Sequence, residues 1–447
     1  MSFQQAIQQF LNDNPKLREL EVLATDVCGH FFGKRYPIEK LASFAEDGLA
    51  FPASMFLLGT TGDALANTYY GIDDGDPDAD FHLIENSLCI NQWSSQPRAQ
   101  VMASTIGSSK PAFFEPRAVL QNILQSYAER GWKPMVAFEL EFYLLDGKRD
   151  KDDLIQVVNN PKTGRKDSAV VLSSARISDF ESVIDDIIES CRDQNISTGA
   201  ISSEMGPGQF EINFNHHANV LRAADEACLF KRTVVEIAKK HGMTASFMAK
   251  PFLAEAGNGL HMHISVIDEN GDNVFADGDK PAELLKNAIA GLIACMPACM
   301  SFWAPNVNAY RRYKGGISCA PVSQTWGHEN RTVAFRIPIA RDSAWRVENR
   351  VPGADANPYL AMATSLAAML QGMNEKMDPG DASTEAINSI DENLPLDLLS
   401  ALTMTRSNEA FSQILGSDFV DLYLNHRLAE FQSFNQIISA QEYDWYL

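Results

Sequence analysis

The segment FELEFYLL, residues 138–145, decides the fold, because it alternates acidic and apolar residues inside an otherwise hydrophobic stretch. Side chains two residues apart on a β-strand point to the same face of a sheet. A strand here therefore places Glu139 and Glu141 side by side on one face. Two neighbouring carboxylates repel each other in a low-dielectric setting, and burying them unpaired is costly. The segment predicts a buried strand that faces a site with compensating positive charge.

The same pattern recurs on three further segments, each of them apolar with chargeable side chains on one face. These are GPGQFEINF (206–214), GLHMHISVI (259–267) and SAWRVENRV (343–351). The side chains concerned are Glu211, with Glu204 upstream of it, then His261 and His263, and finally Arg346, Glu348 and Arg350. The simplest account is one antiparallel sheet whose concave face forms a polar, metal-binding site. Five glutamates with so few imidazoles favour Mg²⁺ or Mn²⁺ over Zn²⁺.

Arginine is dense in the same part of the chain, at residues 311, 312, 331, 336, 341, 346 and 350. Guanidinium groups recognise phosphate and carboxylate groups through paired hydrogen bonds. A metal-dependent hydrolase could use the same glutamates and histidines, but it does not explain so many arginines. Neither a phosphate-binding P-loop nor a dinucleotide fingerprint is present, and no serine or cysteine nucleophile motif stands out.

The composition bounds the function. The chain has 447 residues and a formal net charge of −21, which argues against a nucleic-acid partner. The N-terminus shows no basic region followed by an apolar run, so we expect no signal peptide. The apolar segment 288–305 is interrupted by Pro297 and predicts a buried helix rather than a membrane span. Seven scattered cysteines predict free thiols and, with the other features, a cytoplasmic protein without a membrane partner.

Strands and helices do not alternate regularly, which favours an α+β fold. Beyond the segments above, we expect strands at 133–145 and 331–339 and helices at 116–130, 219–242 and 357–373. The acidic run 70–82 predicts an exposed loop. The segment 107–116 has the composition of a link, so we expect domains at 1–111 and 112–447.

Six segments together resemble the signature motifs of the glutamine synthetase superfamily, over residues 112 to 375. They are FELEFYLL, EMGPGQFEINF, MAKPFLAEAGNGLHMHIS, NVNAYRR, WGHENRTVAFRIP and RVENRVPGADANPYL. The resemblance implies a small N-terminal β-grasp domain and a catalytic domain with a curved antiparallel sheet and flanking helices. It implies ATP-dependent ligation of an amine to the γ-carboxylate of L-glutamate through γ-glutamyl phosphate, giving ADP and phosphate. It also implies a homo-oligomer, a dodecamer of two stacked hexamers, with sites between neighbouring subunits.

The resemblance assigns roles to residues as follows. One Mg²⁺ or Mn²⁺ is assigned to Glu141, Glu204 and Glu211, and a second to Glu139, His261 and Glu348. Contacts to ATP are assigned to His263, Ser265, Arg336 and Arg346, and the position beside the transferred phosphoryl group to Arg331. Contacts to glutamate are assigned to Gly257, Arg312 and Arg350. The residues expected to carry the chemistry are Arg331, Glu141 and Glu348.

Two departures from the ammonium-using pattern point to a larger amine. Pro52 stands where those enzymes have an aspartate, and Cys319 stands where they have a flap glutamate that deprotonates ammonium. A third departure concerns the glutamate subsite, where Ala256 replaces an asparagine before Gly257 and so changes one expected contact to glutamate. The segment RVENRVPGADANPYL looks most like the γ-glutamylputrescine and γ-glutamylpolyamine synthetase branch, which predicts putrescine or another polyamine as substrate. A glutamine synthetase with an altered ammonium site is the alternative, and a non-catalytic family member is a third reading.

Overall fold

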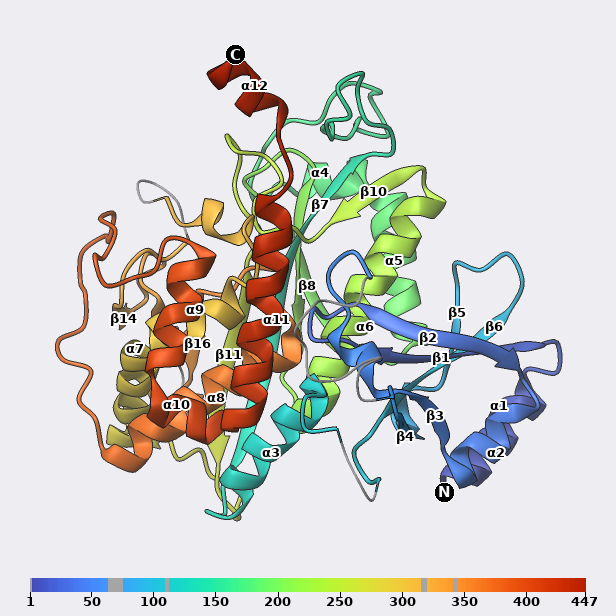
Figure 1. The fold of residues 1–447 in the computed structure, drawn as a ribbon, viewed down its shortest axis with the longest axis horizontal. Coiled ribbons are helices and arrows are strands. Elements are labelled where there is room, and N and C mark those ends of the chain that lie inside the picture. The colour runs from blue at the N-terminus through green and yellow to red at the C-terminus, as the bar shows by residue number, and fades with distance from the viewer. Residues whose placement is uncertain (1, 63–74, 109–111, 315–319, 341–343) are drawn as a thin grey trace.

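The protein is described by a computed structural model that covers residues 2–62, 75–108, 112–314, 320–340 and 344–447. Its described residues form a small sheet near the N-terminus, a larger mixed sheet and a set of C-terminal helices (Figure 1). The predicted α+β fold class is confirmed.

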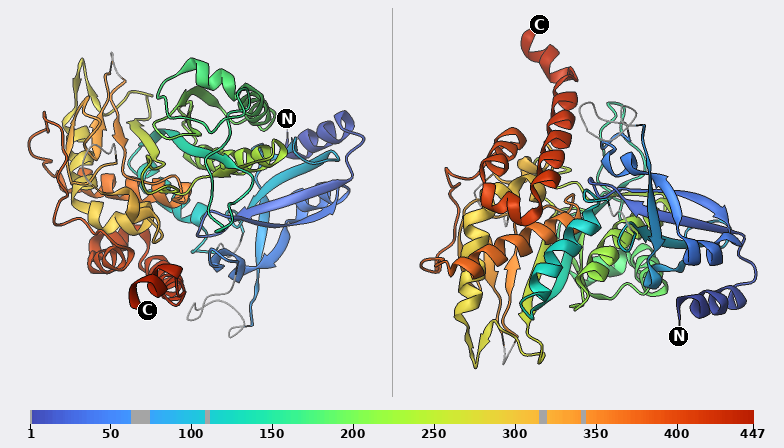
Figure 2. Two further views of the ribbon diagram at one scale, coloured as in Figure 1. Left: turned by 90° about the horizontal axis from the view of Figure 1, so that it is seen from above. Right: turned by 60° about the horizontal axis from the view of Figure 1, so that its bottom comes forward.

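The small sheet is built from residues 19–104 and lies on one side of the molecule (Figures 1 and 2). Its strands are β1 (Glu19–Thr25), β2 (Phe31–Pro37), β3 (Leu49–Pro52), β4 (Asp78–Leu83), β5 (Cys89–Asn91) and β6 (Arg98–Ser104). Their order is β2-β1-β6-β4-β3, with β5 paired to β6 and β1 parallel to β6. Helices α1 (Phe3–Asp13) and α2 (Lys40–Asp47) accompany the sheet. The run 70–82 was predicted as a loop. That prediction is wrong for 78–82, which form β4, and 70–74 lie outside the described residues.

The larger sheet carries the candidate site. Its strands are β7 (Lys133–Asp146), β8 (Thr198–Ser203), β9 (Gln209–Phe214), β10 (Met243–Ser246), β11 (Leu260–Ile267), β14 (Trp326–His328), β15 (Phe335–Ile337) and β16 (Val347–Asn349). The order is β14-β15-β16-β11-β7-β9-β8, with β10 paired to β7. All of these pairs are antiparallel except β14–β15, which is parallel. A short hairpin of β12 (Ala276–Asp277) and β13 (Lys280–Pro281) lies apart from it.

Strand β7 shows the alternation that its sequence predicts. Phe138, Leu140 and Phe142 are fully buried, whereas the two glutamates between them are only partly buried. The Phe142 ring packs on Phe210 of β9 and Phe230 of α6 (Val220–Lys240). Because the apolar face anchors the strand in the core, the opposite face must present its carboxylates to the site.

Helices flank the larger sheet and continue to the C-terminus. They are α3 (Pro116–Ala128), α4 (Ser174–Asp179), α5 (Glu181–Asp193), α6, α7 (Glu283–Trp303), α8 (Pro358–Glu375), α9 (Leu398–Ser407), α10 (Glu409–Leu415), α11 (Ser417–Asn435) and α12 (Ala440–Tyr446). Short 3₁₀ turns occur at Ala53–Leu57, Glu85–Ser87 and Ala309–Arg312. The last helix, α12, projects away from the rest of the chain (Figure 1 and the right view of Figure 2).

Helix α7 is the predicted buried apolar helix, and Pro297 lies inside it. Among the described residues it is the one helix apolar and long enough to cross a membrane, but 72% of its most apolar window is buried in the protein. It crosses α8 closely, since a Cβ on Gly291 would lie 2.1 Å from the carbonyl oxygen of Ala368. Helix α7 therefore belongs to the protein core.

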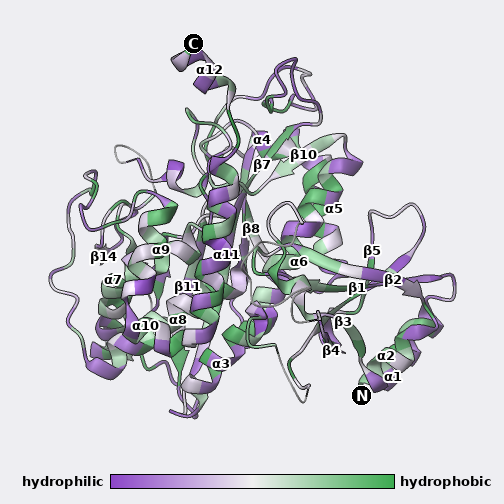
Figure 3. Cartoon of the chain, in the orientation of Figure 1, coloured by the Kyte–Doolittle hydropathy of each residue, from purple (hydrophilic) through white to green (hydrophobic). Residues whose placement is uncertain are grey.

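Figure 3 shows that hydrophobic residues occur in helices and strands throughout the fold, and that helix α1 carries both hydrophilic and hydrophobic residues.

Other element predictions need correction in length. The strand expected at 331–339 is confined to β15, and the strand expected at 343–351 is confined to β16. The strand expected at 206–214 begins at Gln209, after the turn that the two glycines form. The two sheets fall on either side of residue 112, whereas the domain boundary there stays a prediction.

Candidate active site

The register of the larger sheet brings the predicted polar residues onto one face. Going across the sheet, the directly opposed pairs are Arg336 with Glu348, Glu348 with His263, His261 with Glu139, and Glu141 with Glu211. Opposed residues on neighbouring antiparallel strands have their side chains within contact distance. The pattern read on four separate segments thus becomes one row of charged groups that crosses five strands.

His261 lies at the centre of two groups of possible metal ligands. Ligand atoms of Glu139, His261 and Glu348 lie within 4.8 Å of one another, and so do those of Glu141, Glu211 and His261. The Nδ1 atom of His261 is 3.3 Å from Glu139 Oε2 and 4.0 Å from Glu348 Oε1. The first group is the triad that the family resemblance assigns to one cation. The second group contains two of the three glutamates assigned to the other cation.

Glu204, the third of those glutamates, is not part of either tight group. It follows β8, and its carboxylate accepts a hydrogen bond from the Ser202 hydroxyl at 2.8 Å. Burial raises the pKa of Glu204, and the charge of Glu141 raises it further. The two carboxylates are therefore close enough to repel each other. Its role as a metal ligand stays a prediction.

The carboxylates of the row lie in different electrostatic surroundings. Burial, followed by the charges of Glu141, Glu139 and Glu204, raises the pKa of Glu211 to about 9. Burial also acts to raise the pKa of Glu139, but hydrogen bonds from His261 and His263 outweigh it and lower that pKa. The negative charges around Glu211 are thus not fully balanced by the neighbouring protein groups. Oxygen-rich ligand sets with surplus negative charge fit Mg²⁺ or Mn²⁺.

Glu348 is held between two arginines at one end of the row. It is only 1% exposed, and its Oε2 accepts a hydrogen bond from Arg336 Nη1 at 2.7 Å while its Oε1 accepts one from Arg350 Nη1. Burial acts to raise the pKa of Glu348, but Arg350 and the two histidines outweigh it and lower that pKa to about 2. The buried Nε atoms of Arg336 and Arg350 make no hydrogen bond among the described residues. Unpaired guanidinium N–H groups beside the row fit an anionic ligand.

Replacing Glu348 with glutamine should destabilise the metal-free protein by about 3 kcal/mol, because two buried guanidinium groups lose their counter-charge. The folded pKa of about 2 lies below the ordinary value of 4.5, so this contribution is present above pH 4.5 and is lost as the pH falls toward 2. Urea unfolding followed by circular dichroism at pH 7 and pH 3 measures both effects.

The matched control is Glu329→Gln. Glu329 also pairs with Arg336, at 3.2 Å, but its side chain is 42% exposed. Exposed pairs contribute about 0–1 kcal/mol, so this variant should unfold nearly as the wild type does. Equal destabilisation by the two substitutions would contradict the central place of Glu348.

Glu141 is positioned by groups that the sequence reading did not single out. Its Oε2 accepts hydrogen bonds from the backbone N–H of Gly259 at 2.8 Å and from the Gln209 amide at 3.4 Å. The Gln209 amide also donates to the carbonyl oxygen of Gly257 at 3.0 Å. Gln209, Glu211 and Asn213 alternate along β9, and that spacing was the available signal. Gln209 therefore connects the carboxylate row to the loop before β11.

The residues predicted to contact glutamate lie together. The Gly257 backbone is packed against Arg312, because a Cβ there would lie 2.9 Å from Arg312 Cγ. The Arg312 guanidinium is buried and donates to the carbonyl oxygens of Val351, at 2.6 Å, and Pro352, at 3.3 Å. Those carbonyls directly follow Arg350, so Arg312 contacts the segment that carries Arg350. Their contact to a substrate stays a prediction.

The residues predicted to contact ATP continue the row along β11. His263 Nε2 lies 2.9 Å from Glu139 Oε1, and Arg346 Nε donates to His263 Nδ1 at 3.3 Å. Ser265 is two residues further on the same face. Arg331 is exposed in the turn between β14 and β15. Cys319 and Arg341 lie outside the described residues, and Pro52 ends strand β3.

Comparison with known proteins identifies the family. Residues 113–446 match the model of the glutamine synthetase catalytic domain. The chain is 38% identical over 451 residues to gamma-glutamylputrescine synthetase PuuA of Escherichia coli (strain K12), covering 100% of this chain and 95% of that protein. It is 32% identical to glutamate–isopropylamine ligase of a Pseudomonas species, covering 85% of this chain and 83% of that protein.

A solved structure agrees with this fold over almost the whole chain. The structure described as a GmaS/ADP complex superimposes with a TM-score of 0.82 at 25% identity, and the match covers 98% of this chain and 99% of that one. The family match covers all the residues of the row of acidic, imidazole and guanidinium groups. The chain therefore belongs to the glutamine synthetase family, as its motifs predict.

Proposed function

We propose that the protein is an ATP-dependent ligase that joins the γ-carboxylate of L-glutamate to an organic amine, putrescine or another polyamine. The reaction runs through γ-glutamyl phosphate and gives ADP and phosphate. The observation that carries the proposal is the full-length similarity to an enzyme named for γ-glutamylputrescine synthesis, together with the row of site residues. Similarity to a ligase of glutamate and isopropylamine supports an organic amine over ammonium.

The two groups around His261 fit Mg²⁺ or Mn²⁺, and we assign Glu139, His261 and Glu348 to one cation and Glu141, Glu211 and Glu204 to the other. When bound, the cations would neutralise charge on phosphate oxygens. Gln209 and Gly259 hold Glu141 in place for this role. The guanidinium groups of Arg336 and Arg350 do the same for Glu348.

Polar and positively charged side chains would assist the phosphoryl transfer from ATP to the glutamate γ-carboxylate. His263, Ser265, Arg336 and Arg346 would contact the nucleotide, and the ADP named in the similar structure supports a nucleotide site in this fold. Arg331 would stabilise charge on the group in transfer. Gly257, Arg312 and Arg350 would orient glutamate. The amine nitrogen then attacks the acyl carbon, phosphate leaves, and the nitrogen loses a proton.

The amine end of the site lacks the acids that an ammonium enzyme uses. Pro52 and Cys319 stand at the two positions concerned, and neither side chain carries a carboxylate. A small cation such as ammonium needs carboxylates for capture and deprotonation. The replacement of these carboxylates favours a larger organic amine, whose carbon chain and further amino groups can also contact the protein.

The proposal is tested by phosphate release from ATP with L-glutamate and a panel of amines, namely putrescine, longer polyamines, isopropylamine and ammonium. We expect kcat/KM for at least one di- or polyamine to exceed that for ammonium by about 10²-fold, since polar contacts made by one substrate and lacking in another discriminate strongly. Mass spectrometry identifies the product. Higher kcat/KM with ammonium than with every organic amine would establish the glutamine synthetase alternative instead.

The assembly and location follow the same proposal. We expect a cytoplasmic homo-oligomer, a dodecamer of two stacked hexamers. Its partners are small molecules, without nucleic acid or membrane, in keeping with the net charge of −21 and with a largely buried helix α7.

A further inference from the structure

A second group of metal-ligating side chains lies away from the carboxylate row, where the loop between β1 and β2 meets helix α11. The loop supplies Asp26, Cys28 and His30, at alternate positions. The helix supplies His426 and Glu430, four residues apart and so on one helical face. Some 400 residues of chain separate the two parts, so the fold alone brings them together.

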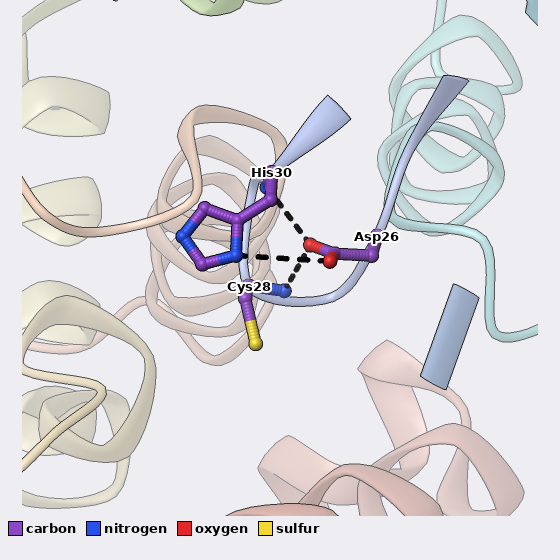
Figure 4. Close-up of side chains that lie close together, drawn as sticks. All are labelled: Asp26, Cys28 and His30. Atoms are coloured by element: carbon purple, nitrogen blue, oxygen red, sulfur yellow. Dashed lines mark hydrogen bonds and ion pairs between the residues drawn. The ribbon is translucent and has the colours of Figure 1, made fainter. Parts of the chain in front are cut away.

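Cys28 belongs to two sets of donors at once. Ligand atoms of Asp26, Cys28 and His30 lie within 4.8 Å of one another, and so do those of Cys28, His426 and Glu430. Figure 4 shows the loop folded around the Asp26 carboxylate, with the His30 ring and the backbone N–H of Cys28 turned toward it. Four further donors, two carboxylates and two imidazoles, thus lie within 4.8 Å of the Cys28 thiol.

Both carboxylates are oriented by hydrogen bonds from the protein. Asp26 Oδ1 accepts the backbone N–H groups of Cys28 at 2.9 Å and His30 at 2.8 Å, and Oδ2 lies 3.8 Å from the His30 ring. Glu430 Oε2 accepts a 2.6 Å hydrogen bond from Arg427, and its Oε1 accepts a longer one, at 3.3 Å, from the backbone N–H of Thr60. Outer groups that fix a carboxylate in this way are typical of metal sites.

His426 provides an independent sign that a ligand belongs here. Its side chain is fully buried, and its Nδ1 makes no hydrogen bond among the described residues. Its Nε2 lies 3.1 Å from the carbonyl oxygen of Leu58, and the Cys28 thiol shares that oxygen at 3.7 Å. Buried polar atoms nearly always have a hydrogen-bond partner in native proteins. The His426 Nδ1 atom therefore has the capacity to bind a ligand.

We propose that Cys28, His426 and Glu430, with Asp26 or His30 as the fourth donor, form a binding site for Zn²⁺. A thiolate and an imidazole select Zn²⁺, whereas Mg²⁺ and Mn²⁺ prefer oxygen-only sets. Binding replaces the thiol proton with the cation. The proposal is independent of the proposed catalytic function, because it uses none of the residues of the carboxylate row.

The site would fasten the small sheet to the C-terminal helices. The same loop already receives hydrogen bonds from the Asn357 side chain, to the carbonyl oxygen of Asp26 at 3.0 Å, and from Arg427, to that of Val27 at 3.0 Å. Asn357 is the N-cap of α8. A cation that joins the loop to α11 would therefore tie β1, α8 and α11 at one point.

The test uses the full-length protein, stripped with a chelator and kept in excess Mg²⁺ so that the carboxylate row is occupied. Addition of Co²⁺ should produce a thiolate-to-cobalt charge-transfer band, and after dialysis against Zn²⁺ the wild type should retain about one more Zn²⁺ per chain than Cys28→Ser does. Glu430→Gln should weaken Zn²⁺ binding at least 10-fold. The matched control is Glu236→Gln, which removes the carboxylate of another helical i, i+3 ion pair, with Lys239, and should bind Zn²⁺ as the wild type does.

The proposal is overturned if the wild type gives no charge-transfer band. It is equally overturned if Cys28→Ser keeps both the band and the additional Zn²⁺, or if Glu236→Gln loses as much affinity as Glu430→Gln. Should Cys28→Ser fail to fold, the wild-type band and the comparison of the two glutamate variants decide the question.

Discussion

Replacing Arg331 with glutamine is expected to lower kcat by roughly 10³–10⁵-fold, the range measured for arginines that stabilise a phosphoryl group in transfer. Arg331 stands exposed in the turn between β14 and β15, so its guanidinium is free to meet a phosphate rather than serve the core. The loss should fall on kcat, with a smaller change in the KM for ATP, because the interaction strengthens in the transition state. Steady-state assays with the preferred amine measure both constants.

The matched control for that substitution is Arg311→Gln. Arg311 is also exposed, and its guanidinium donates to the carbonyl oxygen of Val307 within its own segment. We expect this variant to keep its kcat within a factor of about three, as is usual for surface changes away from a site. A loss of activity confined to Arg311→Gln, with Arg331→Gln active, would refute the assignment of Arg331.

Replacing Glu141 with glutamine should lower kcat/KM at least about 10²–10³-fold, the usual cost of removing one group that stabilises charge in an active site. The amide oxygen can still accept the Gly259 N–H and Gln209 contacts that reach Oε2, so the strand keeps its place. The amide nitrogen would stand at the position of Oε1, which lies 4.0 Å from His261 Nε2. There it offers neither negative charge nor a lone pair to a cation.

A thermal-shift measurement separates this effect from simple unfolding. Mn²⁺ should raise the melting temperature of the wild type, because a ligand that binds only the folded state stabilises it. The rise should be much smaller in Glu141→Gln. Asp146→Asn is the control, since Asp146 ends the same strand but pairs with Lys166 at the surface, and it should respond to Mn²⁺ as the wild type does. An undiminished Mn²⁺ response in Glu141→Gln would remove Glu141 from the metal site.

The parts of the site that the sequence predicts are those on regular strands. Glu139 and Glu141 on β7, and His261 and His263 on β11, were predicted to share faces, and the register brings them together. Period-two spacing suffices there because a strand leaves no other choice of direction. The family resemblance added the grouping of residues from different segments into two metal sites, which spacing within one strand cannot supply.

The parts that the sequence did not predict depend on side chains that bridge segments. Gln209 donates hydrogen bonds to both Glu141 and the Gly257 carbonyl. Glu329 pairs with Arg336, which also binds Glu348. The spacing of residues within one segment does not reveal either contact. The strand around Arg336 is also shorter than its composition predicts. Polar bridging of this kind is set by tertiary contacts rather than by local periodicity.

Strand β7 carries the core on one side and the carboxylates on the other, and this fixes its length as well as its composition. Insertion or deletion of a single residue within Lys133–Phe138 would exchange the two sides, drawing acid into the interior and exposing aromatic rings. Lineages of this enzyme can therefore diverge in that strand by replacement alone. Gains and losses of sequence, and engineered grafts for new amines, belong in the connections at either end.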